Sequence, residues 1–204
     1  MKLRHVQAAI WQGWTANLLM IMLVSVAQAD NIEGSFSNDF GELIYSRDAG
    51  LIGLKNQELA IGLFLNEDNN VVPHFTLSTE VLKDKSPIRF TVGGRAYFGV
   101  LTEPDDDVVG LAFGASARYK LPFDRFPVLE RFPIHISSGI YFAPAITTSG
   151  SNIEIIDVDF VRGEIELTPR IHGFAGLRLF EFDREPGEDT LIDSVIYGGA
   201  RFTF

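Results

Sequence analysis

Apolar and polar residues alternate with a period of two along most of the chain beyond residue 30. In IRFTVGGRAYFGV (88–100), one side of the alternation is apolar or small, and the other side carries Arg89 and Arg95. A period of two is the mark of a β-strand whose two faces meet different surroundings. No comparable helical period is present, so the pattern predicts an all-β fold. The alternation recurs in 71–81, 109–120, 134–146, 170–179 and 192–204.

Two kinds of barrel share this alternation. A soluble, lipocalin-like barrel turns its apolar face inward, whereas a transmembrane barrel turns it toward lipid and keeps a polar interior. Many of the strands are about ten residues long or longer, which is the length that crosses a bilayer at a tilt. Their polar faces mix long charged residues with Gly, Ala and Ser, as a narrow interior requires. We therefore predict an antiparallel transmembrane up-and-down β-barrel of eight to ten strands, with a soluble periplasmic binding barrel as the alternative.

The strand count depends on two places in the sequence. Bacterial single-chain membrane barrels have even strand numbers, but nine segments have strand character. Ten strands result if the first segment breaks near Asn38-Asp39. Eight result if segment 153–167 does not cross, since its alternation changes phase between Phe160 and Ile165. The segments are 32–47, 57–66, 71–82, 88–102, 107–120, 132–146, 153–167, 170–183 and 191–204.

The first 29 residues have the composition of a secretory signal peptide. Lys2 and Arg4 precede a short apolar run from Leu18 to Val26, and Ala27-Gln28-Ala29 has the small-x-small form of a cleavage site. The run is shorter than the ~20 residues of a spanning helix. We expect residues 1–29 to be cleaved and residues 30–204 to form the barrel, exported to the bacterial outer membrane. The chain has no Cys, so neither disulfides nor a lipid anchor through Cys are expected.

Acidic residues gather in three turns. The whole chain has a formal net charge of −10, which argues against nucleic acid as a partner, because phosphate binding needs a basic face. With the C-terminus in the periplasm, the acidic turns all fall on the outer side, and the turns near 83–87, 122–133 and 169 face the periplasm. The acidic turns are 66–70, 103–107 and 183–190.

The polar faces predict a charged interior. In a barrel of eight to ten strands, side chains nearly fill the lumen, and charges there must be paired, hydrogen-bonded or wetted. Mutually satisfied ion pairs that plug the barrel are one interpretation. The other is a net positive lumen that favours a small anion in a narrow pore, because arginines outnumber acids in the predicted set. That set is Arg89, Arg95, Arg118, Arg170, Arg178, Arg201, Glu58, Glu80 and Asp193.

Candidate chemistry is sparse. His135 and Ser137 share one strand face, and a base beside a hydroxyl is what nucleophilic acyl transfer needs. The arrangement resembles the His-x-Ser of outer-membrane lipid hydrolases, but the alternation turns both residues away from the lipid face, and no third residue is identifiable. They remain weak catalytic candidates, and we expect no enzyme. We expect no metal site and no cofactor, because the histidines of the predicted strands do not lie on sequential neighbours and an acidic turn is usually solvated. These residues are His74, His135, His172 and Asp105–Asp107.

The sequence resembles one known family. The resemblance rests on four segments within residues 88–204: FTVGGRAYF, the turn EPDDD, VGLAFGASARYKLPF and the ending GEDTLIDSVIYGGARFTF. They are similar to the YfaZ-type outer-membrane proteins, a family of small β-barrels. The resemblance implies outer-membrane residence and carries over no catalytic residue.

The chain ends inside its last predicted strand. Phe202 and Phe204 lie on its apolar side, and we expect this strand to close the barrel, because an open edge does not survive in hydrocarbon. The resemblance adds that a terminal aromatic looks like the tag read by the barrel-assembly machinery. We therefore predict a porin-like outer-membrane barrel with a structural, narrow-pore or surface-binding role. Its expected partners are outer-membrane lipid and lipopolysaccharide, with the assembly machinery and periplasmic chaperones during biogenesis.

Overall fold

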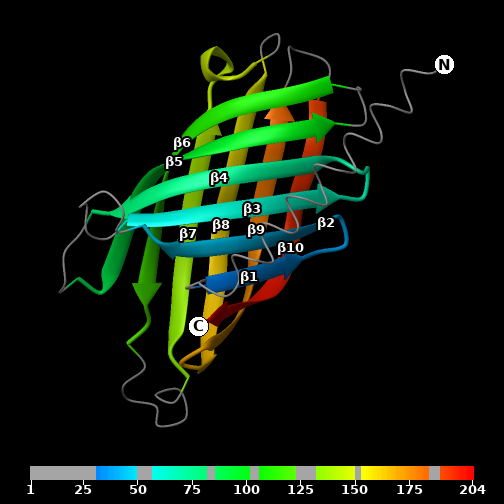
Figure 1. Ribbon diagram of the computed structural model, residues 1–204. Coiled ribbons are helices and arrows are strands. Elements are labelled where there is room, and N and C mark those ends of the chain that lie inside the picture. The colour runs from blue at the N-terminus through cyan, green and yellow to red at the C-terminus, as the bar shows by residue number, and fades with distance from the viewer. Residues whose placement is uncertain are drawn as a thin grey trace.

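Ten antiparallel strands form one closed barrel in the computed structural model (Figure 1). It describes residues 31–49, 57–81, 86–101, 106–122, 132–149, 153–183 and 189–204. The prediction of an all-β antiparallel barrel is confirmed, with the larger of the two expected strand numbers. The expected signal peptide lies outside the described residues. The strands are β1 (Asn31–Phe36), β2 (Phe40–Asp48), β3 (Gln57–Asn66), β4 (Val71–Glu80), β5 (Ile88–Leu101), β6 (Asp106–Lys120), β7 (Ile134–Ala143), β8 (Glu154–Thr168), β9 (Ile171–Asp183) and β10 (Asp189–Thr203).

Each strand pairs with its neighbours in sequence, and β1 pairs with β10 to close the sheet. Asn31 lies opposite Thr203, and Glu33 lies opposite Arg201. The Thr203 hydroxyl donates a hydrogen bond of 2.8 Å to Asn31 Oδ1. The final strand therefore closes the barrel, as its sequence predicts. In Figure 1, β1–β4 cross obliquely in front of β7–β10.

The first predicted segment is two strands joined by a tight turn. The Ser37 hydroxyl accepts hydrogen bonds from the backbone N–H of Asp39 at 3.0 Å and of Phe40 at 3.1 Å. A serine side chain that holds its own backbone in this way favours a turn over a continuing strand. The break expected near Asn38-Asp39 is real, and it supplies the tenth strand.

Segment 153–167, whose alternation changes phase, does form a full strand of the barrel wall, β8. Asp159 lies opposite Arg178 of β9 and Val161 lies opposite Leu177, so Phe160 is an extra residue. Both Phe160 and Val161 are exposed on the outer face. This β-bulge lets the residues on either side of it keep the same face despite the shift in sequence parity. The eight-strand alternative is wrong for that reason.

The two ends of the barrel differ in their connections. We call the end where β1 begins and β10 ends the proximal end, and the opposite end the distal end. The acidic turns 66–70, 103–107 and 183–190 all fall at the distal end by the strand order. In the first of them, Asn69 takes a positive φ of 62°, a conformation that Asn tolerates better than most residues. A short 3-10 turn (η3, Ala145–Thr147) follows β7 at the same end.

The alternating apolar residues lie on the outside of the barrel. Phe113 is 61% exposed and Ile196 is 78% exposed. A lipocalin-like barrel would turn this apolar set inward, so the structure has the opposite arrangement. Among the described residues, no helix is both long and apolar enough to cross a membrane. Other exposed apolar residues of the outer face include Leu43, Phe75, Leu77, Phe90, Val92, Phe98, Val109, Leu111, Ile136, Ile140, Phe142, Phe202 and Phe204.

Part of the interior is apolar, which the sequence analysis did not predict. Phe40 stacks on Phe64 with ring centroids 5.0 Å apart, and Phe64 meets the edge of Phe180 at 5.0 Å. Phe180 in turn packs against Tyr97 at 5.5 Å and against Phe182 at 5.1 Å. Because these rings come from β2, β3, β5 and β9, they join opposite walls of the barrel. Most of the cluster lies toward the distal end; its other members are Val72, Val108, Ala112, Ala143, Ile153, Ile155, Phe174 and Tyr197.

The bulge in β8 predicts that deletions of one residue are tolerated there and not in β9. Deleting Phe160 removes the extra residue and leaves the inward residues of β8 facing inward. Deleting Leu177, which has no bulge beside it in β9, turns one half of that strand inside out. We expect the Phe160 deletion to give a folded β-sheet protein by circular dichroism, with a melting temperature near that of the parent chain. Loss of the folded protein on deleting Phe160, as for Leu177, would contradict the bulge.

Candidate functional site

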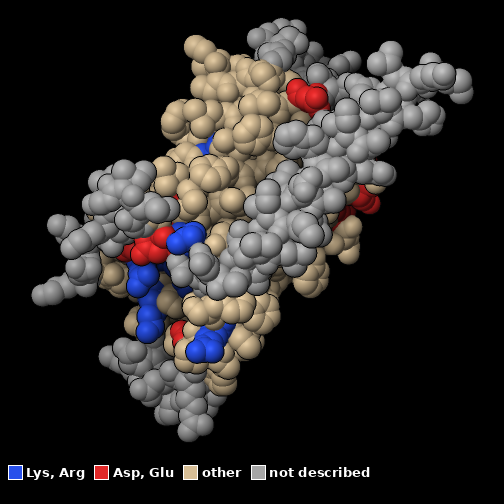
Figure 2. All heavy atoms as spheres, in the orientation of Figure 1, with Lys and Arg blue, Asp and Glu red and all other residues tan. Residues whose placement is uncertain are grey.

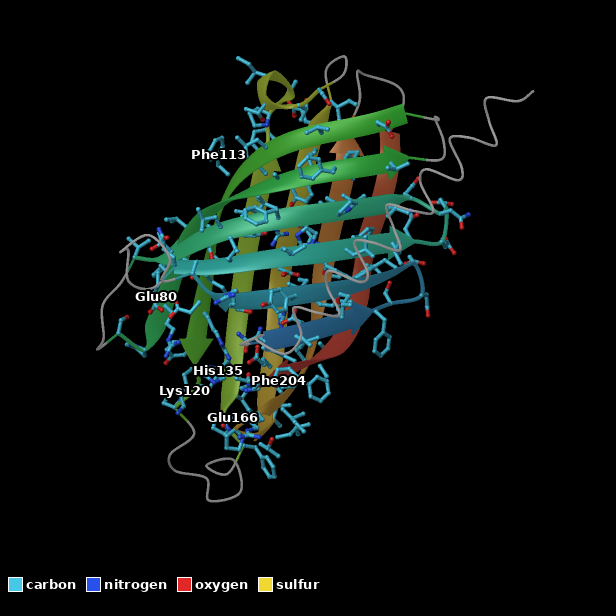
Figure 3. All side chains as sticks on the ribbon, viewed as in Figure 1. Glu80, Phe113, Lys120, His135, Glu166 and Phe204 are labelled. Atoms are coloured by element: carbon cyan, nitrogen blue, oxygen red, sulfur yellow. The ribbon has the colours of Figure 1, made fainter. Side chains whose placement is uncertain are left out.

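A charged cavity occupies the proximal half of the barrel interior. Its volume is about 360 Å³. Figure 3 shows Glu80, Lys120, His135 and Phe204 toward this end of the barrel, whereas Phe113 lies apart from them, near the middle of β6. The charged residues that line the cavity are Glu33, Glu42, Glu58, Glu80, Arg89, Arg95, Arg118, Asp157, Asp159, Arg162, Glu164, Arg178 and Arg201.

Arg178 of β9 is the centre of the deeper network. Its guanidinium donates to Asp157 of β8 at 2.9 and 3.1 Å, and to Glu42 of β2 at 2.6 Å. All three side chains are buried. The guanidinium also lies 5.5 to 5.7 Å from the ring centroids of the apolar cluster, within the range of a cation–π contact. Arg178 therefore contacts both the charged residues of the cavity and the aromatic rings of the apolar cluster.

Two further groups complete this network. Asp157 also accepts hydrogen bonds from Arg95 Nη1 at 2.6 Å and from the Tyr97 hydroxyl at 2.9 Å. The His74 ring lies 3.0 Å from Glu42 Oε1. A Cβ on Gly62, which is opposite His74 in the sheet, would come within 2.1 Å of that ring. The close approach of the His74 ring therefore requires glycine at position 62. Glu42 and Asp157 both find hydrogen-bond partners on other strands of the barrel.

A second network lies nearer the proximal end. Arg162 of β8 binds Glu33 of β1 with two hydrogen bonds, of 2.6 and 2.8 Å, and Arg201 of β10 donates to the same carboxylate at 2.9 Å. Glu164 pairs with Arg118 and lies 3.3 Å from Arg201. The pairs of Glu33 cross the seam between β1 and β10, so they form only when the barrel is closed.

The structure places most of the predicted interior residues in the cavity, but not all. Arg170 is exposed in the turn between β8 and β9 and does not line the cavity. The side chain of Asp193 lies outside the described part of β10. Those that do line it are Arg89, Arg95, Arg118, Arg178, Arg201, Glu58 and Glu80.

The predicted excess of arginine in the interior is wrong. Sequence reasoning supplied three acids, of which Glu58 and Glu80 line the cavity, but it missed the acids that hold most of the arginines. It also missed Arg162. The phase change at Phe160 could have revealed the missed acids of β8. The missed acids of β1 and β2 escaped notice because 32–47 was treated as one segment with one alternation. The missed acids are Glu33, Glu42, Asp157, Asp159 and Glu164.

His135 and Ser137 lie on β7, and both face the interior of the barrel. Ser137 lines the cavity and lies opposite Arg118 of β6 and Arg162 of β8, and His135 lies opposite Glu164. Within the described residues, no hydrogen bond joins the His135 ring to the Ser137 hydroxyl. The pair therefore shares a face without the base–hydroxyl contact that activates a nucleophile.

The histidines belong to separate surroundings. His74 contacts Glu42 in the deeper network, and His172 Nδ1 lies 3.0 Å from Glu164 Oε1 in the proximal one. In the part of the chain that the structure describes, no three His, Asp or Glu side chains are placed to hold a metal ion. Asp107 is exposed at the distal end, and the side chains of Asp105 and Asp106 lie outside the described set.

Comparisons with known proteins were made at the level of families, sequences and structures. No family model and no curated protein matches the chain. A bacterial polysaccharide outer membrane secretin is similar with a TM-score of 0.43 and 11% identity, over 85% of this chain and 69% of that chain. The NanC porin is similar with a TM-score of 0.32 and 12% identity, over 85% of this chain and 99% of that chain. Similarities at this level carry no functional argument.

Arg178 provides a test of the deeper network. Arg178→Met would leave Asp157 and Glu42 buried with fewer compensating charges, and removal of one partner of a buried ion pair costs about 3–5 kcal/mol. We expect the free energy of unfolding in urea to fall by that amount. Arg170→Met, in the exposed turn, is the matched control and should change it by no more than about 0.5 kcal/mol. Equal effects of the two variants would contradict the central place of Arg178.

Proposed function

We propose that the chain is a closed outer-membrane β-barrel that does not conduct ions and that presents a charged internal cavity at its proximal end. The outer face supports the membrane assignment. It is apolar along the strands, and a contiguous apolar surface of this extent on a soluble monomer would be an interaction or aggregation site. Figure 2 shows Lys, Arg, Asp and Glu side chains gathered mainly toward the proximal end, while the visible wall of the barrel carries few charges.

The placement of exposed phenylalanines also fits a bilayer. Membrane barrels carry aromatic residues at both boundaries of their apolar band. Here exposed phenylalanines of the outer face lie near both ends of the strands. They are Phe90, Phe132, Phe202 and Phe204 at the proximal end, and Phe36, Phe98 and Phe142 at the distal end.

The chain of aromatic rings across the lumen carries the proposal of a closed barrel. Phe64 and Tyr97 are fully buried and Phe180 is 2% exposed. Arg178, directly against these rings, has two buried acidic partners. Rings that span the interior and ion pairs that are already complete leave no continuous polar path for an ion through that layer. The role that fits is structural or binding, and we assign no reaction and no YfaZ-specific activity.

The membrane assignment has a direct test. We expect the protein in the membrane fraction, released by detergent and not by osmotic shock. A folded transmembrane barrel resists SDS until it is boiled, so its gel mobility should change on heating. Release by osmotic shock without detergent would instead indicate a soluble periplasmic barrel.

The closed interior predicts the behaviour of the protein in a planar bilayer. The parent chain should show no stable conductance steps. A variant with Phe40→Ala, Phe64→Ala and Phe180→Ala removes three rings of the layer, and we expect it to show steps. The control removes three rings from the lipid-facing side, through Phe75→Ala, Phe90→Ala and Phe98→Ala, and should remain silent. Stable conductance of the parent chain would contradict the proposal.

We further propose that Phe204 is part of the signal for assembly, together with Phe202. Phe204 is 67% exposed at the end of the closing strand, where an assembly factor can reach it. Deleting Phe204 should lower the amount of heat-modifiable protein in the outer membrane several-fold, while Phe90→Ala, an exposed aromatic elsewhere at the proximal end, should not. An unchanged membrane level of the Phe204 deletion would contradict this role.

A further inference from the structure

Two charged residues at the mouth of the cavity, Arg89 and Glu80, differ from the charges inside it. In the deeper and proximal networks, each acid is matched by an arginine or a tyrosine of the barrel. At the mouth, the ion pairs of the described residues include neither Arg89 nor Glu80, although both line the same cavity. They lie on neighbouring strands, β5 and β4, and no ion pair joins them. Among the described residues, Arg89 and Glu80 are therefore available to another molecule at the mouth.

The basic charges lie together on β5 and β6. Arg89 is directly opposite Arg118 in the sheet, and Lys120 lies two residues beyond Arg118 on β6. Like charges in directly opposed positions repel each other. Arg118 is only partly compensated, because Glu164 takes its Nη2 while its buried Nε has no hydrogen-bond acceptor in the described structure. An anionic group at this point would relieve the repulsion and supply the missing acceptor.

The acidic charges lie together on β2, β3 and β4. Asp48 is directly opposite Glu58, and Glu80 ends β4. These three line an extension of the cavity, of about 280 Å³, that shares Glu58 and Glu80 with the main space. These carboxylates also repel one another, and a cationic group would relieve that repulsion.

The acidic arc, on β2 to β4, and the basic arc, on β5 and β6, face one space and adjoin where β4 pairs with β5. Adjacent strands are about 4.8 Å apart, so β3 and β5 lie about 10 Å apart along the wall. The hydroxyls of Ser78 on β4 and Thr91 on β5 line the cavity in this interval. Long Arg and Glu side chains shorten the gap further. A molecule a few bonds long, with a negative group at one end and a positive group at the other, would meet both arcs at once.

We propose that the mouth of the cavity binds a small zwitterion. Its phosphate or carboxylate lies against Arg89 and Arg118, and its ammonium lies against Glu58 and Glu80. Hydrogen bonds between charged groups are stronger than those between neutral groups, and complementary charge gives such a site its selectivity. The deeper ion pairs of Arg178 form the floor of the site and do not contact the ligand.

The test uses three probes that differ only in their charged ends. They are phosphoethanolamine, which has both, ethyl phosphate, which lacks the ammonium, and ethanolamine, which lacks the phosphate. Binding to the folded, detergent-solubilised full barrel is measured by titration calorimetry. We expect saturable binding of phosphoethanolamine, binding of ethyl phosphate at least about tenfold weaker, and still weaker binding of ethanolamine.

Two variants test which residue binds which charged end of the ligand. Arg89→Gln should weaken phosphoethanolamine and ethyl phosphate alike, by about tenfold or more. Glu80→Gln should weaken phosphoethanolamine while leaving ethyl phosphate unchanged. Arg170→Gln, in the exposed turn, is the matched control and should change neither. Arg89 is exposed and Glu80 is at a strand end, so heat-modifiable migration should show that both variants still fold.

Three outcomes would overturn the proposal. The first is the absence of saturable phosphoethanolamine binding to the folded protein. The second is equal affinity for phosphoethanolamine and ethyl phosphate, which would reduce the mouth to a simple anion site. The third is an equal loss in Arg170→Gln, which would indicate non-specific attraction to surface charge. None of these outcomes bears on ion conductance or membrane residence, so the site and the closed barrel stand or fall separately.

Discussion

A closed barrel has one narrow interior, and each charge that a strand turns inward must find its partner across that interior. Arg178 shows how strongly this constrains the chain. Its two acidic partners come from β8 and β2, and its third contact is with rings from β2, β3 and β9. A shift of any of these strands by one residue would turn its partner to the outer face. The buried guanidinium therefore helps to fix the register of distant strands, a specificity role that buried ion pairs can serve.

The sequence predicted the walls of the barrel well because a period of two is a local property. The alternation in β5 and β6 identified Arg89, Arg95 and Arg118 as inward-facing from their own strands alone. The contents of the interior could not be derived in the same way. Which acid meets which arginine depends on the closed register, and the pairs of Glu33 and Glu42 join residues more than 120 positions apart.

Irregular backbone accounts for the remaining errors. The bulge at Phe160 reverses the sequence parity within β8, so a constant period assigns one of its halves to the wrong face. The turn at Ser37 also reverses the parity, so a single alternation over 32–47 cannot place both Glu33 of β1 and Glu42 of β2 inside. The inner phenylalanines of β9 show a different limit. Phe180 and Phe182 follow Arg178 on the same parity, and an apolar residue on the inner face looks no different in sequence from one on the outer face.

The interior changes in character along the barrel axis. Toward the distal end, aromatic rings pack against one another across the lumen. Toward the proximal end, ion pairs leave a cavity between them, and at the mouth the acidic and the basic residues lie on separate groups of strands. This gradient fits a binding cup better than a pore, because a pore requires polar surface along its whole length. The packed aromatic rings of the distal half close the inner end of this cavity.

The cavity depends on the closing of the sheet. Glu33 enters with the first strand and Arg201 with the last, and Arg162 binds the same carboxylate from β8. Until β10 pairs with β1, this carboxylate lacks Arg201, and the proximal network that supports the cavity wall is incomplete. The terminal strand DSVIYGGARFTF therefore does two things with its two faces. Phe202 and Phe204 continue the apolar outer surface to the edge of the barrel, and Arg201 completes the network inside it.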